Sequence, residues 1–439
     1  MRIIISRRRN EGSVLLFALV LVIMIGISLA SYLDLVSFQN LSAMRSQQWN
    51  SAIPVLEAGI EEALTHLHYS GTNLAGNGWQ LLNDVYTKER EIGDAKYVVT
   101  MSQDPRPVII SKAYVRAPLG TNYIEPPRTV RVTVTNAPMF AKGMVAKGQI
   151  ELGGNKIKTD SFDSADPNYS DNGRYDEDKA KDNGDVATNS ILVDSLNVWN
   201  AEIFGKASTG PGGTVKIGPN GSVGSKQWHD DGKKGIEPGW SNDDMNVQFP
   251  DVKVPFSGGA STPASGSLGG TNYTYIIGAG NWQLSSLNLS GSDKLLVTGN
   301  AVLYVTGNVS LSGQAKIIIN QTSSLNLYVG GSTASLGGNG IVNEGGNATN
   351  FWYWGLNSNT SVSLSGNASF TGVIYAPYAA LSLGGGGSDE YDFVGSAISD
   401  SVKMNGHFEF HYDENLGRVG PNRGFTVDSW NEVFTYTEI

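Results

Sequence analysis

Residues 308–338 read NVSLSGQAKIIINQTSSLNLYVGGSTASLGG, where short apolar runs alternate with corners made of Gly, Asn and Ser. The motif Leu-x-Gly recurs through this part of the chain, with methionine once in place of leucine and one further copy upstream. The first residues of these motifs are Leu289, Leu311, Leu336, Leu364, Leu383, Met404 and Leu152. An inward leucine and a glycine turn, repeated about every two dozen residues, are typical of a parallel β-helix. The sequence therefore predicts an all-β parallel β-helix.

The charge-poor segment around these motifs also favours ordered structure. The charged side chains of residues 257–388 are Asp293, Lys294, Lys316 and Glu344. The segment is rich in Val, Ile, Leu and aromatic residues, which disordered linkers lack. Asn and Gly suit the corners because they tolerate positive φ. A flat antiparallel sandwich fits the same short strands and stays open as an alternative.

We expect the β-helix to occupy two consecutive parts of the sequence. Residues 139–256 are its first part and carry an acidic loop at 160–188, and residues 257–413 form its Gly/Asn/Ser-rich coils. Residues 414–439 are expected to be a C-terminal tail that caps or covers one end of the rod. In Phe351-Trp352-Tyr353-Trp354, strand alternation predicts two rings inside and two outside.

The N-terminal part of the chain predicts a membrane-spanning helix. Residues 13–33 are 21 positions without a charge. At about 1.5 Å per residue they span about 31 Å, the thickness of a bilayer's hydrocarbon core. Four arginines precede this segment and the first charge after it is Asp34, so the positive-inside rule places the N-terminus in the cytoplasm and the bulk of the chain outside it. A secretory signal peptide cut near Ala30-Ser31 is the alternative.

The helical pattern continues beyond the predicted membrane span. Apolar residues from Leu35 to Leu67 recur mostly three or four apart, so we expect one helix over residues 13–70 with an apolar stripe. Pro54 lies inside this helix and is expected to bend it. Runs of β-forming residues within 71–138 predict a small antiparallel β domain that covers the stripe. The N-terminal part is therefore predicted to be α+β, with a long transmembrane helix and a small antiparallel sheet.

Composition excludes several classes of function. The chain has 41 acidic against 31 basic residues and a net charge of −10, so it offers no basic footprint for nucleic acid. It has no cysteine, which excludes disulfides, thiol nucleophiles and thiolate metal sites. The charge-poor coils offer almost none of the clustered acids that a glycosidase would need. We therefore expect a protein that is not an enzyme.

Two short motifs resemble those of pilin-like proteins. The run Arg7-Arg8-Arg9-Asn10-Glu11-Gly12 followed by Ser13-Val14-Leu15-Leu16 resembles the leader and cut site of type IV pilin-like proteins. Residues 55–64, VLEAGIEEAL, resemble the helix end of the PilX-type minor pilins of type IV fimbrial assembly. The resemblance extends over residues 1–135. An ordinary single-span anchor is the alternative, because short targeting motifs are weak signals.

The resemblance implies that residues 1–12 are a basic leader, which a prepilin peptidase cuts after Gly12, and that the new N-terminus at Ser13 is methylated. It also implies that the helix, with Pro54 and Glu57, assembles with other pilin-like subunits at the bacterial inner membrane, in a type IV pilus or a secretion pseudopilus. Major pilins carry a glutamate four residues after the new N-terminus, where this chain has Phe17. A buried ammonium without that carboxylate is costly in hydrocarbon. The subunit is therefore expected at a tip, at low abundance, or uncleaved.

Parts of the predicted β-helix resemble a β-helical domain found behind pilin-like anchors in bacterial envelope proteins. These parts are residues 160–164, 368–377, 408–416 and 427–430. This second resemblance implies an architecture and no activity.

The acidic loop contains oxygen ligands at spacings that calcium accepts. The candidate ligands are Asp166, Asn168, Asp171, Asp176 and Asp178. Asp171 occupies the position at which a helix-loop-helix calcium loop has glycine. A solvated loop that bulges from one coil is the alternative. We therefore expect no cofactor, and calcium is the one candidate.

A second metal candidate lies near the end of the predicted coils. His407, Glu409 and His411 alternate along residues 406–412. On a strand they would therefore share one face and could coordinate a metal ion. The alternative is that they form the outward polar face of the last coil, with Phe408 and Phe410 inward.

These features together predict a non-enzymatic, membrane-anchored pilin-like subunit that displays a β-helical rod for adhesion or scaffolding. The expected partners are the cytoplasmic membrane, other pilin-like subunits, prepilin peptidase and surface polysaccharide, but no nucleic acid. The alternative is a carbohydrate-binding or carbohydrate-active envelope β-helix protein with a simple N-terminal anchor.

Overall fold

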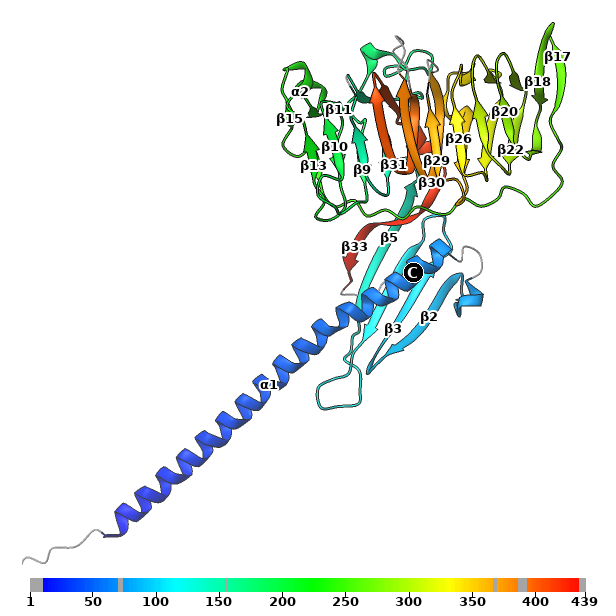
Figure 1. The fold of residues 1–439 in the computed structure, drawn as a ribbon. Helices are drawn as coiled ribbons and strands as arrows, with labels where there is room; N and C mark the ends of the chain where they lie inside the picture. The colour runs from blue at the N-terminus through cyan, green and yellow to red at the C-terminus, as the bar shows by residue number, and fades with distance from the viewer. Residues whose placement is uncertain (1–10, 70–73, 155, 366–368, 386–392, 434–439) are drawn as a thin grey trace, which may run out of the picture. The chain divides into compact units, whose positions relative to one another are not determined.

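Two compact units make up the chain. The computed structural model describes residues 11–69, 74–154, 156–365, 369–385 and 393–433 (Figure 1). Unit 1 comprises Met1–Ala137 and Gly424–Ile439, and unit 2 comprises Pro138–Arg423. Unit 2 is therefore an insertion in the sequence of unit 1, between strands β5 (Arg128–Pro138) and β33 (Asn422–Glu432).

In unit 1 one long helix, α1 (Glu11–Tyr69), packs on an antiparallel sheet. The six strands of the sheet lie in the order β1-β2-β3-β4-β5-β33. The bounds of the remaining elements are η1 (Ala75–Asn77), β1 (Gln80–Leu82), β2 (Val85–Ile92), β3 (Ala95–Ser102) and β4 (Val108–Tyr114). Neighbouring strands from β1 to β5 run antiparallel. The predicted α+β arrangement of a long helix and an antiparallel sheet is confirmed.

The last third of α1 attaches the helix to strands β3 and β4. Ala52, Leu56, Ile60 and Ala63 are buried and recur at the spacing of one helix face. The side chains that they join in the core of unit 1 include Val99, Met101, Ile109, Val130 and Val132. The helix continues through Pro54, which lies on its exposed side.

Unit 2 is built from three stacks of parallel strands. Successive strands along the chain belong to different stacks, and each strand pairs in parallel with a strand one coil away. The strands β19, β22, β25 and β28 pair in that order in one stack, and β20, β23, β26 and β29 do so in the next. This parallel pairing contradicts the flat antiparallel sandwich considered as an alternative.

We name the stacks A, B and C and give their strands in spatial order. Stack A contains β19 (Gly280–Leu284), β22 (Asn300–Val305), β25 (Ser324–Val329), β28 (Phe351–Gly355), the middle of β30 (Phe370–Gly385) and of β31 (Phe393–Gly406), β6 (Met144–Ala146), β9 (Val186–Thr188), β12 (Ala207–Ser208) and β16 (Ser241–Asn242). Stack B contains β20 (Leu287–Leu289), β23 (Val309–Leu311), β26 (Thr333–Leu336), β29 (Ser361–Leu364), the last parts of β30 and β31, β7 (Ile150–Leu152), β10 (Leu196–Trp199) and β13 (Val215–Ile217).

Stack C has two parts. The first contains β18 (Thr271–Ile277), β21 (Lys294–Val297), β24 (Lys316–Ile319) and β27 (Ile341–Asn343). The second contains the starts of β30 and β31, β32 (Glu409–Asp413), β8 (Lys158–Phe162), β11 (Glu202–Phe204), β14 (Ser222–Gly224) and β15 (Gly235–Ile236). The other elements of unit 2 are β17 (Ala264–Leu268), which is antiparallel to β18, and the short helices η2 (Glu177–Lys179), α2 (Lys226–Asp230), η3 (Ala348–Asn350) and α3 (Leu416–Val419).

The seven Leu-x-Gly motifs lie in stack B, and their first residues pair with one another in register. The order is Leu289, Leu311, Leu336, Leu364, Leu383, Met404 and Leu152. All of them are buried, and they belong to one apolar core that is shared by the three stacks. The prediction that these residues face inward is confirmed.

The spatial order of the coils differs from their order in the sequence. The last strands of the chain's coils, β31 and β32, pair with β6, β7 and β8, which are the first strands of unit 2. Residues 139–256 form one end of the stacks, but they adjoin the last strands of residues 257–413 and not the first ones, which follow them in the sequence. Figure 1 shows α2 and β15 at one end of the row of strands and β17 and β18 at the other.

A long segment, residues 243–263, returns the chain from one end of the stacks to the other. We call it the strap. Its residues Met245, Val247 and Phe249 pack on the outer side of stack A. Asn189 exchanges hydrogen bonds with the backbone of Val247, and Tyr375 donates one to the carbonyl of Pro250 at 2.7 Å. The strap is what allows the coils to be stacked out of sequence order.

The C-terminal strand does not cap the stacks of unit 2. β33 pairs beside β5 in the sheet of unit 1, and Arg128 forms an ion pair with Glu432 at 2.8 Å. Thr133 also bonds to Ser429 at 2.6 Å. The expected cap is not formed by residues 424–433, because β5 offers an unpaired edge whose backbone groups need partners, whereas residues 414–423 with α3 belong to unit 2. Residues 434–439 lie outside the described residues.

Candidate functional site

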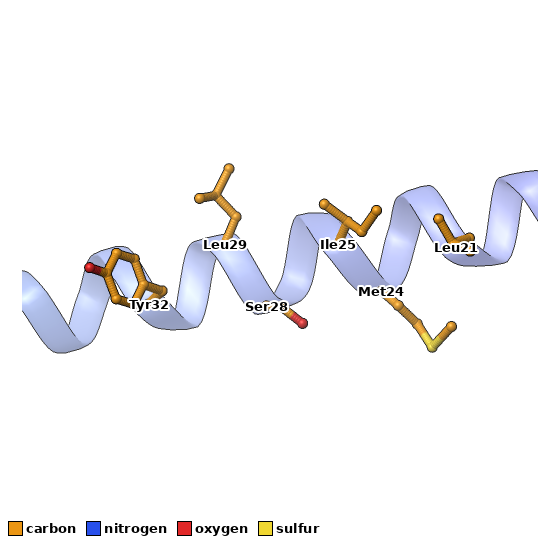
Figure 2. A pocket seen from close by; sticks show the side chains of 6 residues that line it. All are labelled: Leu21, Met24, Ile25, Ser28, Leu29 and Tyr32. Atoms are coloured by element: carbon orange, nitrogen blue, oxygen red, sulfur yellow. The ribbon is translucent and has the colours of Figure 1, made fainter.

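The first feature of interest is the apolar surface of α1 before it reaches the sheet. Large apolar side chains from Val14 to Met44 are exposed, and Phe17 is 66% exposed. Figure 2 shows one stretch of this surface, lined by Leu21, Met24, Ile25, Ser28, Leu29 and Tyr32. By length and composition α1 could cross a membrane. An apolar surface of this size on a helix indicates a contact with lipid or with other apolar helices.

The structure places the predicted assembly residues along this helix. Gly12 and Ser13 lie in the first turn of α1, which begins at Glu11. Pro54 and Glu57 are exposed on the part of the helix that packs on the sheet. The arginines of the predicted leader fall in residues 1–10, outside the described residues.

The second feature is a buried polar cluster between β8 and β32. His411 and Asp160 are both fully buried, and His411 Nδ1 lies 2.6 Å from Asp160 Oδ1. Tyr175 donates a hydrogen bond to Asp160 Oδ2 at 2.7 Å. Lys158 Nζ lies 3.3 Å from the same oxygen. The carboxylate of Asp160 is therefore in contact with an imidazole, a phenol and an ammonium group.

The electrostatics of the cluster favour an ionised Asp160. Burial by itself would raise the pKa of Asp160, but the charges of His411 and Lys158 and the hydrogen bonds from His411 and Tyr175 hold the pKa of this carboxyl below its usual range. Burial and the neighbouring Asp160 raise the pKa of the Tyr175 phenol, which stays protonated as a donor. The pKa of Glu409 is raised by burial.

His407, Glu409 and His411 do not form a metal site in the structure. His407 is exposed, Glu409 is half-buried with Oε2 3.6 Å from His411 Nε2, and His411 is fully buried. Among the described residues no group of three or more His, Asp or Glu side chains is arranged to hold a metal ion. The prediction of Phe408 and Phe410 inward is confirmed.

The expected outward exposure of His411 was wrong, because the ring of Tyr175 stacks on it with centroids 3.7 Å apart. Tyr175 comes from the acidic loop, which lies against this side of stack C. Strand alternation correctly predicted which face of the strand carries His411. No local feature of the sequence shows that a distant loop covers that face. Asp160, Lys158 and Tyr175 were missed as its partners for the same reason.

The candidate calcium ligands make hydrogen bonds within the loop itself, and the side chains of Asp166 and Asp176 cap its turns. Asp166 Oδ1 accepts hydrogen bonds from both the backbone and the side chain of Asn168, each at 2.9 Å. Asp176 accepts from the backbone of Asp178 at 3.1 Å and caps η2. Asp171 exchanges backbone hydrogen bonds with Arg174 at 2.9 Å. These are the usual roles of Asp and Asn in turns.

A further acidic pair lies where the loop meets α3. Asp163 is ion-paired with Arg418. Asp413 is fully buried, and its Oδ1 accepts hydrogen bonds from the backbones of Ser164 and Asn415 at 3.0 and 3.1 Å. Its Oδ2 has no hydrogen-bond partner among the described residues. Burial is the main cause that raises the pKa of Asp413, and the charge of Asp163 adds to it.

The aromatic run at 351–354 is divided as predicted, with Phe351 and Tyr353 buried and Trp352 and Trp354 half-buried on the outside of stack A. Trp354 stacks on Trp352 and on Tyr328, with centroids 5.7 and 5.9 Å apart. Apolar residues of the strap pack against the same cluster as both tryptophans. Since these ring faces meet each other, they are poorly placed to stack on a sugar.

Comparison with known proteins gives one family match. Residues 258–419 match the model of a domain of unknown function, DUF7305. These residues run from just before β17 to the end of α3. No curated protein matches the chain.

Among solved structures, the chain is similar to the competence-associated pilin ComZ from Thermus thermophilus, with 12% sequence identity over 88% of this chain and 97% of that chain. The TM-score is 0.19, which is too low to support an argument.

Proposed function

We propose that this chain is a membrane-anchored, pilin-like subunit in which α1 is the assembly element. The observation that carries the proposal is the change of environment along this one helix. Its apolar side chains are exposed from Val14 to Met44, whereas Ala52, Leu56 and Ile60 are buried against an antiparallel sheet. The first part therefore needs lipid or neighbouring apolar helices, while the second part fixes the helix to its own domain.

The topology follows from the charges around the apolar segment. Arginines precede it and Asp34 follows it, so the N-terminus is cytoplasmic, and the sheet of unit 1 and all of unit 2 lie on the other side of the membrane. Phe17 stands where major pilins have a carboxylate. We place the subunit at a tip or at low abundance in a type IV pilus or secretion pseudopilus, of the PilX-type minor pilin class.

Unit 2 is the part that such a subunit would display. Its three stacks share one core, and the same inward position recurs through seven strands of stack B. This regularity supports a parallel β-helix, which is a stiff scaffold because each coil hydrogen-bonds to the next. Its role is adhesion or scaffolding outside the cytoplasmic membrane, and it is not an enzyme.

N-terminal sequencing and mass spectrometry of the protein from cell membranes test this proposal. We expect a first residue of N-methylated Ser13 and retention in the membrane fraction. A first residue near Ser31 in a soluble fraction would contradict the membrane anchor. An intact Met1 would contradict pilin-like processing and indicate an ordinary single-span anchor. A Gly12→Leu variant is the matched control, because it alters the cut site and leaves the apolar segment unchanged.

A further inference from the structure

A small cavity lies within unit 2, between the strap and the outer side of stack A. Its volume is about 110 Å³. Its walls are mostly apolar and come from the start of unit 2, from β6 and β31, and from the strap. The apolar side chains are Met139, Val145, Met245, Val247, Phe249 and Ile398. The cavity is therefore an apolar pocket on the side of the stacks and is separate from their shared core.

Two hydrogen bonds hold the strap where it borders this cavity. Asn189 accepts a hydrogen bond from the Val247 N–H at 3.1 Å, and Tyr375 donates one to the Pro250 carbonyl at 2.7 Å. Residues 248 and 249 lie between these two bonds in the sequence, and both line the cavity. The wall formed by the strap is therefore held in place without a ligand, as is usual for small-molecule sites.

Two cationic side chains also line the cavity, and they differ in their partners. Lys142 Nζ lies 2.8 Å from Asp185 Oδ2, so its charge is neutralised within the protein. Arg423 is half-buried, and among the described residues its guanidinium takes part in no hydrogen bond or ion pair. Burial lowers the pKa of Arg423, which is the direction expected for a cation without a neighbouring carboxylate. The donors of Arg423 are therefore available to a ligand.

An unpaired guanidinium at the wall of an apolar cavity favours one class of ligand. A guanidinium binds a carboxylate through two parallel N–H···O bonds. Burying a charge without a partner is costly, and a bound carboxylate would remove that cost. An apolar cavity of about 150 Å³ in another protein holds benzene, so this smaller cavity suits an alkyl group of roughly four or five carbons.

We propose that this cavity binds a short apolar carboxylate, whose charged end pairs with Arg423 and whose alkyl group lies between the strap and stack A. A cationic ligand of the same shape would meet the like charges of Arg423 and Lys142. An alcohol of the same shape would leave the guanidinium without a counter-charge. The proposal rests on residues of unit 2 alone, so it does not depend on how α1 is processed or assembled.

Ligand-observed NMR titration of the full chain with hexanoate tests this proposal. The chain is held in nanodiscs of phosphatidylcholine, and empty nanodiscs measure the hexanoate that enters the lipid. We expect hexanoate to bind at least tenfold more tightly than hexan-1-ol, hexylamine or acetate, which respectively lack the charge, reverse it and lack the alkyl group. Absence of hexanoate binding beyond that of empty nanodiscs, or equal affinity for the alcohol, would overturn the proposal.

Variants assign the binding to this cavity. Arg423→Gln should lower the affinity for hexanoate at least tenfold, whereas Arg423→Lys, which keeps the positive charge, should lower it less. Ala141→Phe adds a ring at a residue that lines the cavity, and it should also lower the affinity at least tenfold. Lys253→Gln is the matched control, because Lys253 is an exposed cation of the strap that does not line the cavity. If Arg423→Gln or Ala141→Phe were folded by circular dichroism and bound hexanoate as tightly as Lys253→Gln, the proposal would be wrong.

Discussion

Met404 lies directly beside Leu152 in stack B, although the two residues come from opposite ends of unit 2. Both side chains are fully buried in the core shared by the three stacks. Leu383 occupies the same position on the other side of Met404. The stacks therefore continue without a break across the place where the chain begins and ends its path through unit 2, and the two connecting segments leave side by side, with Met139 N–H donating to Pro421 O at 2.9 Å.

A cysteine cross-link tests this spatial order. The chain contains no cysteine, and Lys403 pairs in register with Glu151 on the outer side of stack B. We expect a Glu151→Cys/Lys403→Cys variant to be joined by a short bismaleimide reagent, as measured by electrophoretic shift and peptide mass spectrometry. In the control, Glu151→Cys is combined with Asn288→Cys, which lies several strands away in the same stack. Equal cross-linking of both pairs would contradict the permuted order.

The sequence predicted the inward residues of stack B because a Leu-x-Gly repeat reports a local geometry, a short strand followed by a turn. It did not predict that β31 would pair with β6 and β7, because every coil presents similar backbone edges and the choice among them is made by long-range packing. The polar cluster shows the same limit. Alternation placed His411 opposite Phe410, but its partners Asp160 and Tyr175 come from a distant part of the chain.

At Gly59, α1 lies in close contact with its sheet. A Cβ atom there would lie 2.6 Å from Ser111 Oγ and 2.9 Å from Tyr97 Cδ2. Ser111 is held by a hydrogen bond to Leu56 O, and Tyr97 by one to Glu62. Alanine favours a helix by about 1 kcal/mol over glycine, whereas overpacking costs about 1–3 kcal/mol. The difference between these two terms predicts that Gly59→Ala destabilises unit 1 by up to about 2 kcal/mol.

Hydrogen exchange of the β3 and β4 amides in the detergent-solubilised chain measures this effect. Gly26→Ala is the control, because nothing lies within 4 Å of its added Cβ, and it should leave the exchange rates unchanged. Faster exchange in the Gly26 variant than in the Gly59 variant would show that close packing is not what requires glycine at position 59.

Asp160 is expected to hold the acidic loop on stack C. Asp160→Ala removes the acceptor of His411 and Tyr175 and the partner of Lys158, so we expect a loss of about 3–5 kcal/mol in the stability of unit 2. Asp166→Ala is the control, since Asp166 caps an exposed turn, and should cost about 1 kcal/mol or less. Urea unfolding followed by tryptophan fluorescence at pH 7 compares the two variants. Similar losses would refute a special role for the buried cluster.

The lowered pKa of Asp160 predicts that its contribution to the free energy of unfolding is lost in acid. The pKa of Asp160 is held below its ordinary value of 3.8 in the folded state. Its contribution is therefore present above about pH 4 and is lost as the pH falls through the folded pKa. As the pH falls below 5, the free energy of unfolding of an Asp160→Asn variant should decrease less than that of the wild type, down to the pH at which the proteins unfold. Parallel acid titrations of the two proteins would contradict this assignment.

The raised pKa of Asp413 predicts the opposite dependence of stability on pH. Its pKa is raised from 3.8 in the folded state, so the folded protein binds this proton more tightly than the unfolded chain does. The stabilising effect of that proton is fully present below the unfolded pKa and is lost as the pH rises through the folded pKa. At neutral pH a buried carboxylate oxygen without a partner therefore weakens the fold.

Asp413→Asn removes this penalty and keeps the Oδ1 acceptor of the Ser164 and Asn415 backbones. We expect the variant to be more stable than the wild type at pH 7, by about 1 kcal/mol for each unit by which the pKa is raised. The difference should shrink as the pH falls towards 4, which urea unfolding at several pH values would show. Asp163→Asn is the contrasting control, because it breaks the ion pair with Arg418 and should not stabilise the protein. If Asp413→Asn were instead the less stable protein at pH 7, the carboxylate would be acting as a needed acceptor and not as an isolated buried charge.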